Sequence, residues 1–264
     1  MGKIITIANQ KGGVGKTTTV INLATCLAYY GKNVLVIDID PQANATSGLG
    51  IKNDKVANKN IYHLIIEEVD IKEVIIPTSI DWLDLIPSHI DLTGAEVELV
   101  SMLNREYRLK NSVEKIKDLY DYILIDCPPS LGLLTINALA CCDSVLVPIQ
   151  CEYFALEGLA QLIKTINLVQ RHVNKQLNIE GVILTMYDSR TSLSEEVAVN
   201  VKKYFQHKVY KTIIPRGVRA AEAPSYGKPL LYYDRKSKVT QAYLQLAEEI
   251  LQLTEEVLKL NNQI

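Results

Sequence analysis

The chain has 264 residues and a net charge of −2, with 48% hydrophobic and 22% charged residues. These values are ordinary for a globular protein with a large core, and they exclude a protein that binds polyanions through its bulk charge. The sequence also excludes a membrane-spanning helix, because it contains no run of about 18 apolar residues.

Apolar runs alternate with helical patterns along most of the chain. The stretch 51–117 is less regular and is expected to hold two short strands, at 74–76 and 83–86, and two helices. Elsewhere we expect strands at 4–8, 34–37, 122–125, 144–149, 181–186 and 209–214, and helices at 17–30, 131–140, 155–173, 193–205 and 239–260.

The expected strands are continuously apolar rather than alternating, which is typical of a parallel sheet covered on both faces. The sequence therefore predicts an α/β fold with a doubly wound, mostly parallel sheet and helices on both faces. We expect a single domain over residues 1–264, because no linker rich in Pro, Gly or Ser interrupts the pattern.

The cysteines indicate a reducing compartment. Their number is odd, no CxxC spacing occurs, and two of them are adjacent, which is poor geometry for a disulfide or a zinc site. We therefore expect free thiols and a cytoplasmic protein. The amino terminus lacks the pattern of a signal peptide, since an apolar strand begins at once. The five are Cys26, Cys127, Cys141, Cys142 and Cys151.

A glycine-rich loop joins the first expected strand to the first helix. Its glycines let backbone N–H groups turn toward an anion, and the positive end of the following helix points at the same place. Lys16 adds a charge for the β- and γ-phosphates, and Thr17 offers a hydroxyl to Mg²⁺. The sequence therefore predicts that the protein binds and hydrolyses a nucleoside triphosphate with Mg²⁺. The loop reads Lys11-Gly12-Gly13-Val14-Gly15-Lys16-Thr17-Thr18.

This loop departs from the generic pattern G-x-x-x-x-G-K-[ST]. Its first position holds Gln10 instead of glycine, and an additional lysine, Lys11, precedes Lys16 by five residues. A cation at that position reaches the phosphates of a neighbouring site more easily than those of its own.

Carboxylates follow two of the buried strands. Asp126 ends the strand at 122–125, where a carboxylate orders the hydration shell of Mg²⁺. Asp38 and Asp40 end the strand at 34–37. We expect Asp40 to orient the attacking water, because it falls past the strand end, toward the ligand crevice. As isolated features, both Asp126 and Asp40 could instead cap a helix or a turn.

Positive charge gathers in the C-terminal third. Residues 190–238 contain eleven Lys and Arg against four Asp and Glu, a net charge of +7 in a chain whose total is −2. This asymmetry indicates either an anionic partner or a solvated, lysine-rich face.

Three motifs together resemble the deviant Walker A ATPases of the ParA/Soj group, which segregate chromosomes and plasmids. They are the loop at 11–18, Asp-Ile-Asp-Pro-Gln at 38–42 and Ile-Asp-Cys-Pro-Pro-Ser at 125–130. The likeness continues through residues 214–229 and so runs nearly the whole chain. One departure is Ala43, where the group often has glycine.

The resemblance implies that ATP binding forms a sandwich homodimer, with Lys11 reaching into the partner's site. It also implies that this dimer binds double-stranded DNA without sequence preference at the nucleoid, and that a ParB-type centromere-binding protein stimulates hydrolysis and releases it. DNA binding without sequence preference relies mostly on Lys and Arg side chains that neutralise phosphates. The basic segment 190–238 would supply those side chains.

The resemblance also implies roles for single residues. The catalytic residues are Lys11, Lys16 and Asp40. The nucleotide is held by residues 11–18, with Pro215 and Arg216 beside the adenine. The Mg²⁺ site comprises Thr17, Asp40 and Asp126, and the expected DNA contacts are Arg190, Lys202, Lys203, Arg219 and Lys228.

Relatives with the same loop have other functions. A MinD-like ATPase would end in a basic membrane-binding helix, whereas the last helix here carries four Glu against one Lys, with its apolar positions expected in the core. An iron–sulfur carrier needs a CxxC, which is absent. A repressor would carry a helix-turn-helix before the first strand. A small-molecule ligase of the same superfamily stays open. The helix residues are Glu248, Glu249, Glu255, Glu256 and Lys259, with Leu246, Ile250, Leu253 and Val257 as the apolar set.

Overall fold

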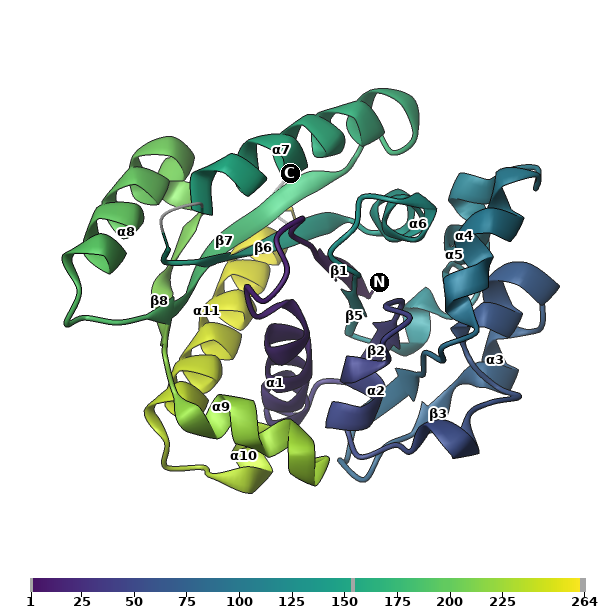
Figure 1. Ribbon diagram of the computed structural model, residues 1–264, viewed down its shortest axis with the longest axis horizontal. Helices are drawn as coiled ribbons and strands as arrows, with labels where there is room; N and C mark the ends of the chain where they lie inside the picture. Colours follow the sequence, from purple (N-terminus) through teal and green to yellow (C-terminus); the bar gives the residue numbers. More distant parts are fainter. Residues whose placement is uncertain (1, 153–154, 262–264) are drawn as a thin grey trace.

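Eight strands form one sheet within residues 2–152 and 155–261, the part of the chain that the computed structural model describes (Figure 1). The strand order is β3-β4-β2-β5-β1-β6-β7-β8, and neighbouring strands are parallel except β3 and β4. The expected mostly parallel sheet is confirmed. The strands are β1 (Lys3–Ile7), β2 (Val34–Asp38), β3 (Ile76–Pro77), β4 (Leu83–Ile86), β5 (Tyr122–Asp126), β6 (Ser144–Gln150), β7 (Asn178–Tyr187) and β8 (Val209–Pro215).

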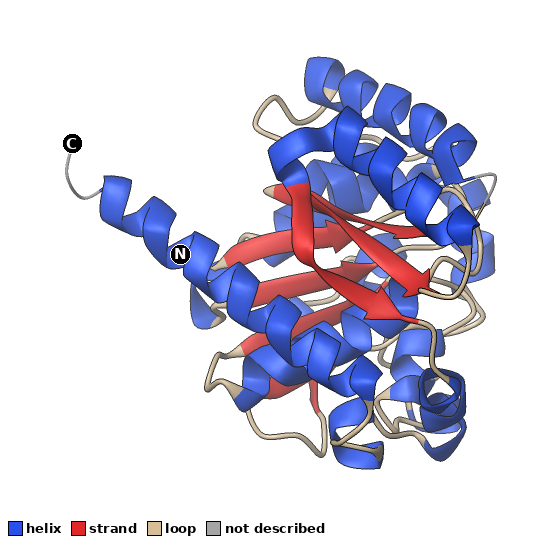
Figure 2. Ribbon diagram, turned by 90° about the vertical axis from the view of Figure 1, so that its left-hand side faces the viewer, coloured by secondary structure: helices blue, strands red, loops and turns tan. Residues whose placement is uncertain are grey.

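Helices cover both faces of this sheet (Figure 2). Helices α1, α2, α10 and α11 bury side chains in one apolar cluster, and α3 to α8 bury theirs in a second cluster on the opposite face. The doubly wound arrangement is therefore confirmed. The helices are α1 (Lys16–Tyr29), α2 (Asn44–Gly48), α3 (Ile71–Val74), α4 (Leu92–Val100), α5 (Arg108–Val113), α6 (Leu133–Cys141), α7 (Ala155–His172), α8 (Ser192–Phe205), α9 (Val218–Glu222), α10 (Leu230–Tyr233) and α11 (Lys238–Asn261).

Strand β5 brings the candidate site together. All five of its side chains are buried, because a parallel strand between two helical layers has no solvent face. It lies between β1 and β2, so that Asp126 pairs in register with Ile7 on one side and with Asp38 on the other. The carboxyl ends of β1, β2 and β5 therefore meet at one edge of the sheet, where the glycine-rich loop begins.

The stretch 51–117 differs from the sequence expectation at its first short strand. The strand expected at 74–76 is displaced to β3 at Ile76–Pro77, because α3 continues to Val74, and β3 pairs antiparallel with β4. Asp70 caps this helix by accepting a hydrogen bond from the N–H of Lys72 at 2.9 Å. Ile71 and Val74 are both buried, three residues apart on one helical face. The cap and this spacing favour a helical turn, and they outweigh the preference of the β-branched residues for a strand. The other elements whose bounds were predicted are confirmed within three residues, but residues 51–117 hold three α-helices, α3, α4 and α5, where two were expected.

Helix α11 runs past the edge of the sheet toward its C-terminal end (Figure 2). Ile250 is fully buried against the sheet, as expected, but Leu253 is 44% exposed. The expected core contact of Leu253 is therefore wrong, because this residue lies on the outer side of the helix, whereas the next residue, Thr254, still contacts the Tyr122 hydroxyl of β5 at 3.1 Å. Val257 lies outside the residues whose side chains are described.

Among the described residues, no helix is both long and apolar enough to cross a membrane. All five cysteines are buried free thiols, as the sequence predicted.

Candidate functional site

The loop between β1 and α1 is fastened to two neighbouring strands. The Asn9 side chain donates a hydrogen bond to the carbonyl oxygen of Pro148 in β6 at 2.7 Å and accepts one from the N–H of Lys11 at 3.0 Å. Thr185 of β7 donates its hydroxyl to the carbonyl oxygen of Val14 at 2.8 Å. The loop is thus held in place from β6 and β7.

Two glycines give this loop its shape. Gly13 and Gly15 have φ angles of +75° and +90°, a region that side chains with a Cβ rarely adopt. Gly15 is the residue before α1, so the first N–H groups of that helix open toward the loop. This arrangement has the geometry with which backbone N–H groups hold anions in proteins.

Lys16 is the first residue of α1 and is only 7% exposed. Its Nζ atom donates to the carbonyl oxygen of Lys11 at 3.3 Å, within the loop. Burial lowers the pKa of Lys16, whereas the nearby carboxyls of Asp126 and Asp40 raise it. A bound phosphate would supply the anionic partner that this buried cation lacks.

Asp126 has the properties of a metal ligand. It has no solvent exposure, and neither of its carboxylate oxygens has a hydrogen-bond partner among the described residues. Burial raises the pKa of Asp126 well above its usual value, and the charge of Asp38 raises it further. An unpartnered buried carboxylate is costly, and with the Thr17 hydroxyl it supplies the oxygen ligands that Mg²⁺ prefers. Thr17, Asp40 and Asp126 therefore fit the predicted Mg²⁺ site.

Asp40 lies at the rim of the same site, 7% exposed. Its Oδ1 atom accepts a hydrogen bond from the N–H of Gln42 at 2.9 Å, and its own N–H donates to Oδ1 of Asp38 at 3.2 Å. These contacts fix its backbone, and the residue lines the main cavity, where a water beside a phosphate would lie.

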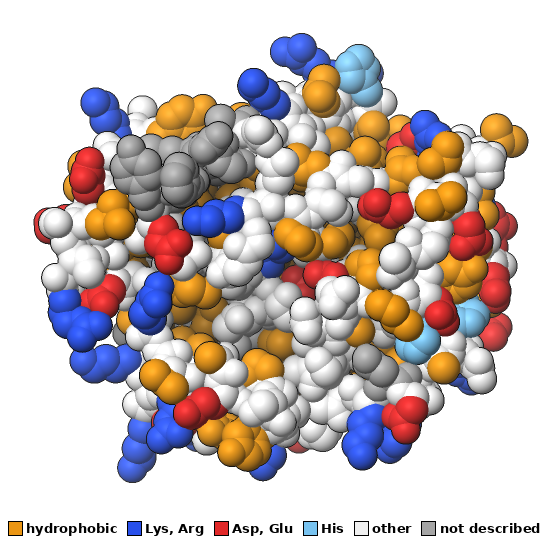
Figure 3. Space-filling model, in the orientation of Figure 1, with side chains coloured by type: hydrophobic (Ala, Val, Ile, Leu, Met, Phe, Trp, Pro, Cys, Tyr) orange, Lys and Arg blue, Asp and Glu red, His pale blue; other side chains and the backbone are white. Residues whose placement is uncertain are grey.

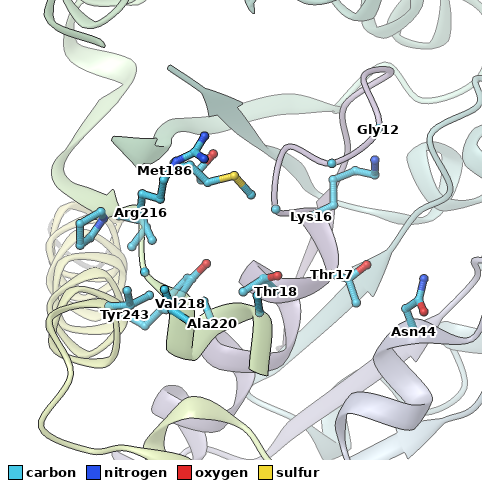
Figure 4. Close-up of a pocket in the computed structure, with 18 of the residues that line it drawn as sticks. Gly12, Lys16, Thr17, Thr18, Asn44, Met186, Arg216, Val218, Ala220 and Tyr243 are labelled. Carbon is cyan, nitrogen blue, oxygen red and sulfur yellow. The ribbon is translucent and has the colours of Figure 1, made fainter. Parts of the chain in front are cut away.

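That cavity has a volume of about 730 Å³ and is open on one side. Figure 4 shows Gly12 and Lys16 on one side of it and Arg216, Val218 and Tyr243 on the other. Gly12, Gly13, residues 15–18 and Asp40 form one end, which suits phosphates, whereas the segment after β8 and the start of α11 form a more apolar end. Pro215 also lines this apolar end, so its expected place and that of Arg216 suit a nucleobase. The centre of this face is visibly hollowed in Figure 3.

Lys11 behaves differently from Lys16. Its Nζ atom pairs with Glu152 at 3.5 Å, and Glu152 also pairs with the Arg216 guanidinium at 3.4 Å. Lys11 does not line the cavity that Lys16 lines. The Glu152 carboxylate thus pairs with both Lys11 and Arg216, two cations that were expected at the nucleotide site.

The sequence reading missed three contributors to the site. Glu152 lies two residues after the last residue of β6, and its place near the carboxyl end of a buried strand was a usable signal. Met186 lines the cavity with a φ of +49°, which nothing in the sequence indicates. Tyr243 is buried at the apolar end, and its hydroxyl lies 3.2 Å from that of Thr19 on α1.

The five expected DNA contacts are all exposed, and they belong to α8, α9 and the loops beside them. Arg190, before α8, donates two side-chain hydrogen bonds and one backbone hydrogen bond to Asp188, and these lower the pKa of that carboxyl. Arg219 of α9 pairs with Glu222 and Asp234. The other three are Lys202, Lys203 and Lys228. Helices α8 and α9 lie on the same side of the molecule in Figure 1, and Lys and Arg side chains line the left and lower margins of Figure 3.

Comparison with known proteins adds independent findings. Residues 2–179 match a family model described as an AAA domain. Over 250 residues the chain is 59% identical to the sporulation initiation inhibitor protein Soj of Bacillus subtilis, covering 95% of this chain and 98% of that protein. It is 53% identical to the chromosome partitioning protein ParA of Myxococcus xanthus, with 95% and 88% covered.

One similar solved structure is cobyrinic acid a,c-diamide synthase from Mycobacterium smegmatis with a bound ATP analogue and magnesium. Its TM-score is 0.85 at 36% identity, and the match covers 97% of this chain and 96% of that chain.

Proposed function

Because this chain belongs to the ParA/Soj family of partitioning ATPases, we propose that ATP joins two copies of it into a dimer that binds DNA without sequence preference. The chain is an ATPase, and its cofactors are ATP and Mg²⁺. The proposal treats the whole chain as one ATPase domain acting in the cytoplasm at the nucleoid. Its cargo is a chromosome or a plasmid.

Within this proposal, each residue of the cavity has one task. The backbone of residues 12–18 and the Lys16 ammonium hold the phosphates, while Thr17 and Asp126 hold Mg²⁺. A bound Mg²⁺ ion supplies charge neutralisation at the phosphate oxygens. Asp40 orients the attacking water, because it is the carboxylate at the open edge of the cavity whose backbone is fixed.

The proposed dimer rests on Lys11. A cation that pairs with Glu152, rather than lining its own cavity, is available to a second copy once that pair opens. Each protomer would then complete the phosphate charge of the other, so that dimerisation depends on ATP. The proposed stimulating partner is a ParB-type protein, whose contact leads to hydrolysis and to release of the dimer from DNA.

The proposed DNA surface consists of the exposed cations Arg190, Lys202, Lys203, Arg219 and Lys228. Two copies present this surface twice, and phosphate contacts multiply the binding constant, so a dimer binds far more tightly than a monomer. ATP thereby controls DNA affinity without altering the surface itself.

Two features together carry this proposal. Lys16 and the glycine-rich loop line a cavity suited to phosphates, and Lys11 stays outside that cavity. The test compares the wild-type protein with Lys16→Ala, Asp40→Ala and Lys11→Ala. ATP binding is followed by calorimetry, assembly by analytical ultracentrifugation and DNA binding by a salt-titrated assay. Lys16→Ala should not bind ATP. Lys11→Ala should bind ATP and remain a monomer that releases DNA.

Asp40→Ala should bind ATP, remain a dimer on DNA and not hydrolyse the nucleotide. With the wild-type protein, hydrolysis should rise when DNA and the cognate ParB-type protein are both added. An Asp40→Ala protein that stays monomeric with ATP and Mg²⁺, and does not bind DNA, contradicts the proposal.

A second candidate function is ATP-dependent amide formation on a small acid. It is favoured by the likeness to the cobyrinic acid diamide synthase. The partition proteins are the closer relatives in sequence, at 59% and 53% identity. Steady ATP turnover with DNA alone, in the absence of any small-molecule acid, distinguishes the first function from the second.

A further inference from the structure

Thr46 links three segments next to the site without lining the cavity. It lies in α2 and has no solvent exposure. Its hydroxyl and its backbone N–H both donate to Oδ2 of Asp38, at 2.7 and 2.8 Å. The same hydroxyl oxygen accepts a hydrogen bond from the N–H of Ser88, after β4, at 2.9 Å. Thr46 is therefore fixed on one side by the chain after β4 and holds Asp38 on the other.

The chain of hydrogen bonds continues to Asp40. The second oxygen of Asp38, Oδ1, accepts from the N–H of Asp40 at 3.2 Å. Both oxygens of the buried Asp38 carboxylate are thus occupied, one by Thr46 and one by the backbone that carries Asp40. A change at Thr46 is transmitted to Asp40 through Asp38, although Thr46 itself touches neither the phosphates nor the attacking water.

We propose that Thr46 is a positioning residue for ATP hydrolysis, which holds Asp38 and, through Asp38, the backbone from which Asp40 reaches the cavity. This inference rests on the role proposed above for Asp40. A valine at position 46 keeps the size and branching of threonine. It removes one of the three donors to Asp38 and leaves the buried N–H of Ser88 without its acceptor. A water-orienting group tolerates little displacement, so the effect falls on the chemical step.

The test measures kcat, KM and the thermal stabilisation by Mg²⁺–ATP for Thr46→Val and Thr46→Ser. The valine variant should lose about 10–100-fold in kcat, as is usual when a supporting hydrogen bond is removed. Its KM and its stabilisation by Mg²⁺–ATP should match the wild-type values, because the phosphate-holding groups are untouched. Thr46→Ser restores the hydroxyl and should recover most of kcat.

Thr25→Val is the matched control. Thr25 is also fully buried, and its hydroxyl donates to the carbonyl oxygen of Ile21 at 2.7 Å within α1. The same chemical change there should lower the melting temperature and leave kcat at the wild-type value. If Thr46→Val lost kcat only because it was less stable, Thr25→Val should lose kcat to the same extent.

Wild-type kcat in Thr46→Val, or no recovery in Thr46→Ser, overturns the inference. Should the valine variant fail to fold, Thr46→Cys, whose thiol is a much weaker donor, gives the same comparison. Asp40→Ala separates the two levels of the argument. If Asp40→Ala hydrolyses ATP normally, the proposed role of Asp40 fails. If it is inactive while Thr46→Val is normal, only the role of Thr46 fails.

Discussion

Asp38 and Asp126 are register partners on the neighbouring strands β2 and β5, and neither has any exposure to solvent. Burial raises the pKa of Asp38 to about 6, against the hydrogen bonds from Thr46, and burial together with Asp38 raises the pKa of Asp126 well above its usual value. Between the unfolded and folded pKa values the native state binds more protons than the unfolded chain. The nucleotide-free protein therefore loses stability as the pH rises through that range.

Asp126→Asn should stabilise the nucleotide-free protein, because the amide keeps the shape and removes the buried charge. The gain in melting temperature should grow as the pH rises through the raised pKa of Asp126 and should shrink as the pH falls toward the ordinary carboxyl pKa, below which the wild-type group is protonated in the folded and unfolded states alike. A gain of 1 kcal/mol corresponds to about 2–4 °C for a chain of this size. Calorimetry in a chelator across this pH range measures it. A difference in melting temperature between variant and wild type that does not change with pH would contradict the raised pKa of Asp126.

Glu152→Gln should tighten ATP binding. The change removes the carboxylate that pairs with Lys11 and Arg216, so that both cations are released. Exposed pairs contribute at most about 1 kcal/mol, so an increase in affinity of up to about fivefold is expected at low salt, and a smaller one at high salt. Isothermal calorimetry measures it. Glu114→Gln, which breaks the surface pair with Lys110, is the control and should leave affinity unchanged.

Arg190→Ala should weaken DNA binding uniformly across sequences. Each dimer would lose two phosphate contacts, and the slope of log affinity against log salt should flatten by about 2. Lys115→Ala removes the same charge from an exposed position after α5, which lies at the opposite end of the molecule from α8 in Figure 1, and should leave the slope unchanged. An unaltered slope in the Arg190 variant removes this residue from the proposed DNA surface.

Gly227→Ala should destabilise the protein more than Gly31→Ala. Both glycines have positive φ angles, of +59° and +77°, so each alanine carries a strain of about 1–2 kcal/mol. At Gly227 the added Cβ would also lie 2.9 Å from the Cα of Gly50, whereas at Gly31 it would meet nothing within 4 Å. Thermal denaturation of the two variants measures the difference, and equal losses would contradict the close packing of Gly227 on Gly50.

The sequence alone predicted the mostly parallel sheet and the group of residues that lies beside the glycine-rich loop. Continuous apolar runs specify buried parallel strands, and the carboxyl ends of such strands must converge, which brings Asp40 and Asp126 to the loop. The pairing of Lys11 with Glu152 was not predictable, because it joins residues 141 positions apart through a single side-chain contact. The strand expected at 74–76 begins two residues later for a local reason, since a cap at Asp70 favours a helical turn through Val74 that the β-branched composition does not indicate.

The apolar end of the cavity comes from the segment after β8 and from Val239 and Tyr243 on α11, some two hundred residues after the loop that forms the phosphate end. During synthesis on the ribosome, the phosphate loop therefore emerges long before the wall against which a nucleobase would rest. A translation product that stops short of β8 carries only half of the binding surface. Newly made chains therefore complete the nucleotide-binding surface late, once α11 has packed on α1.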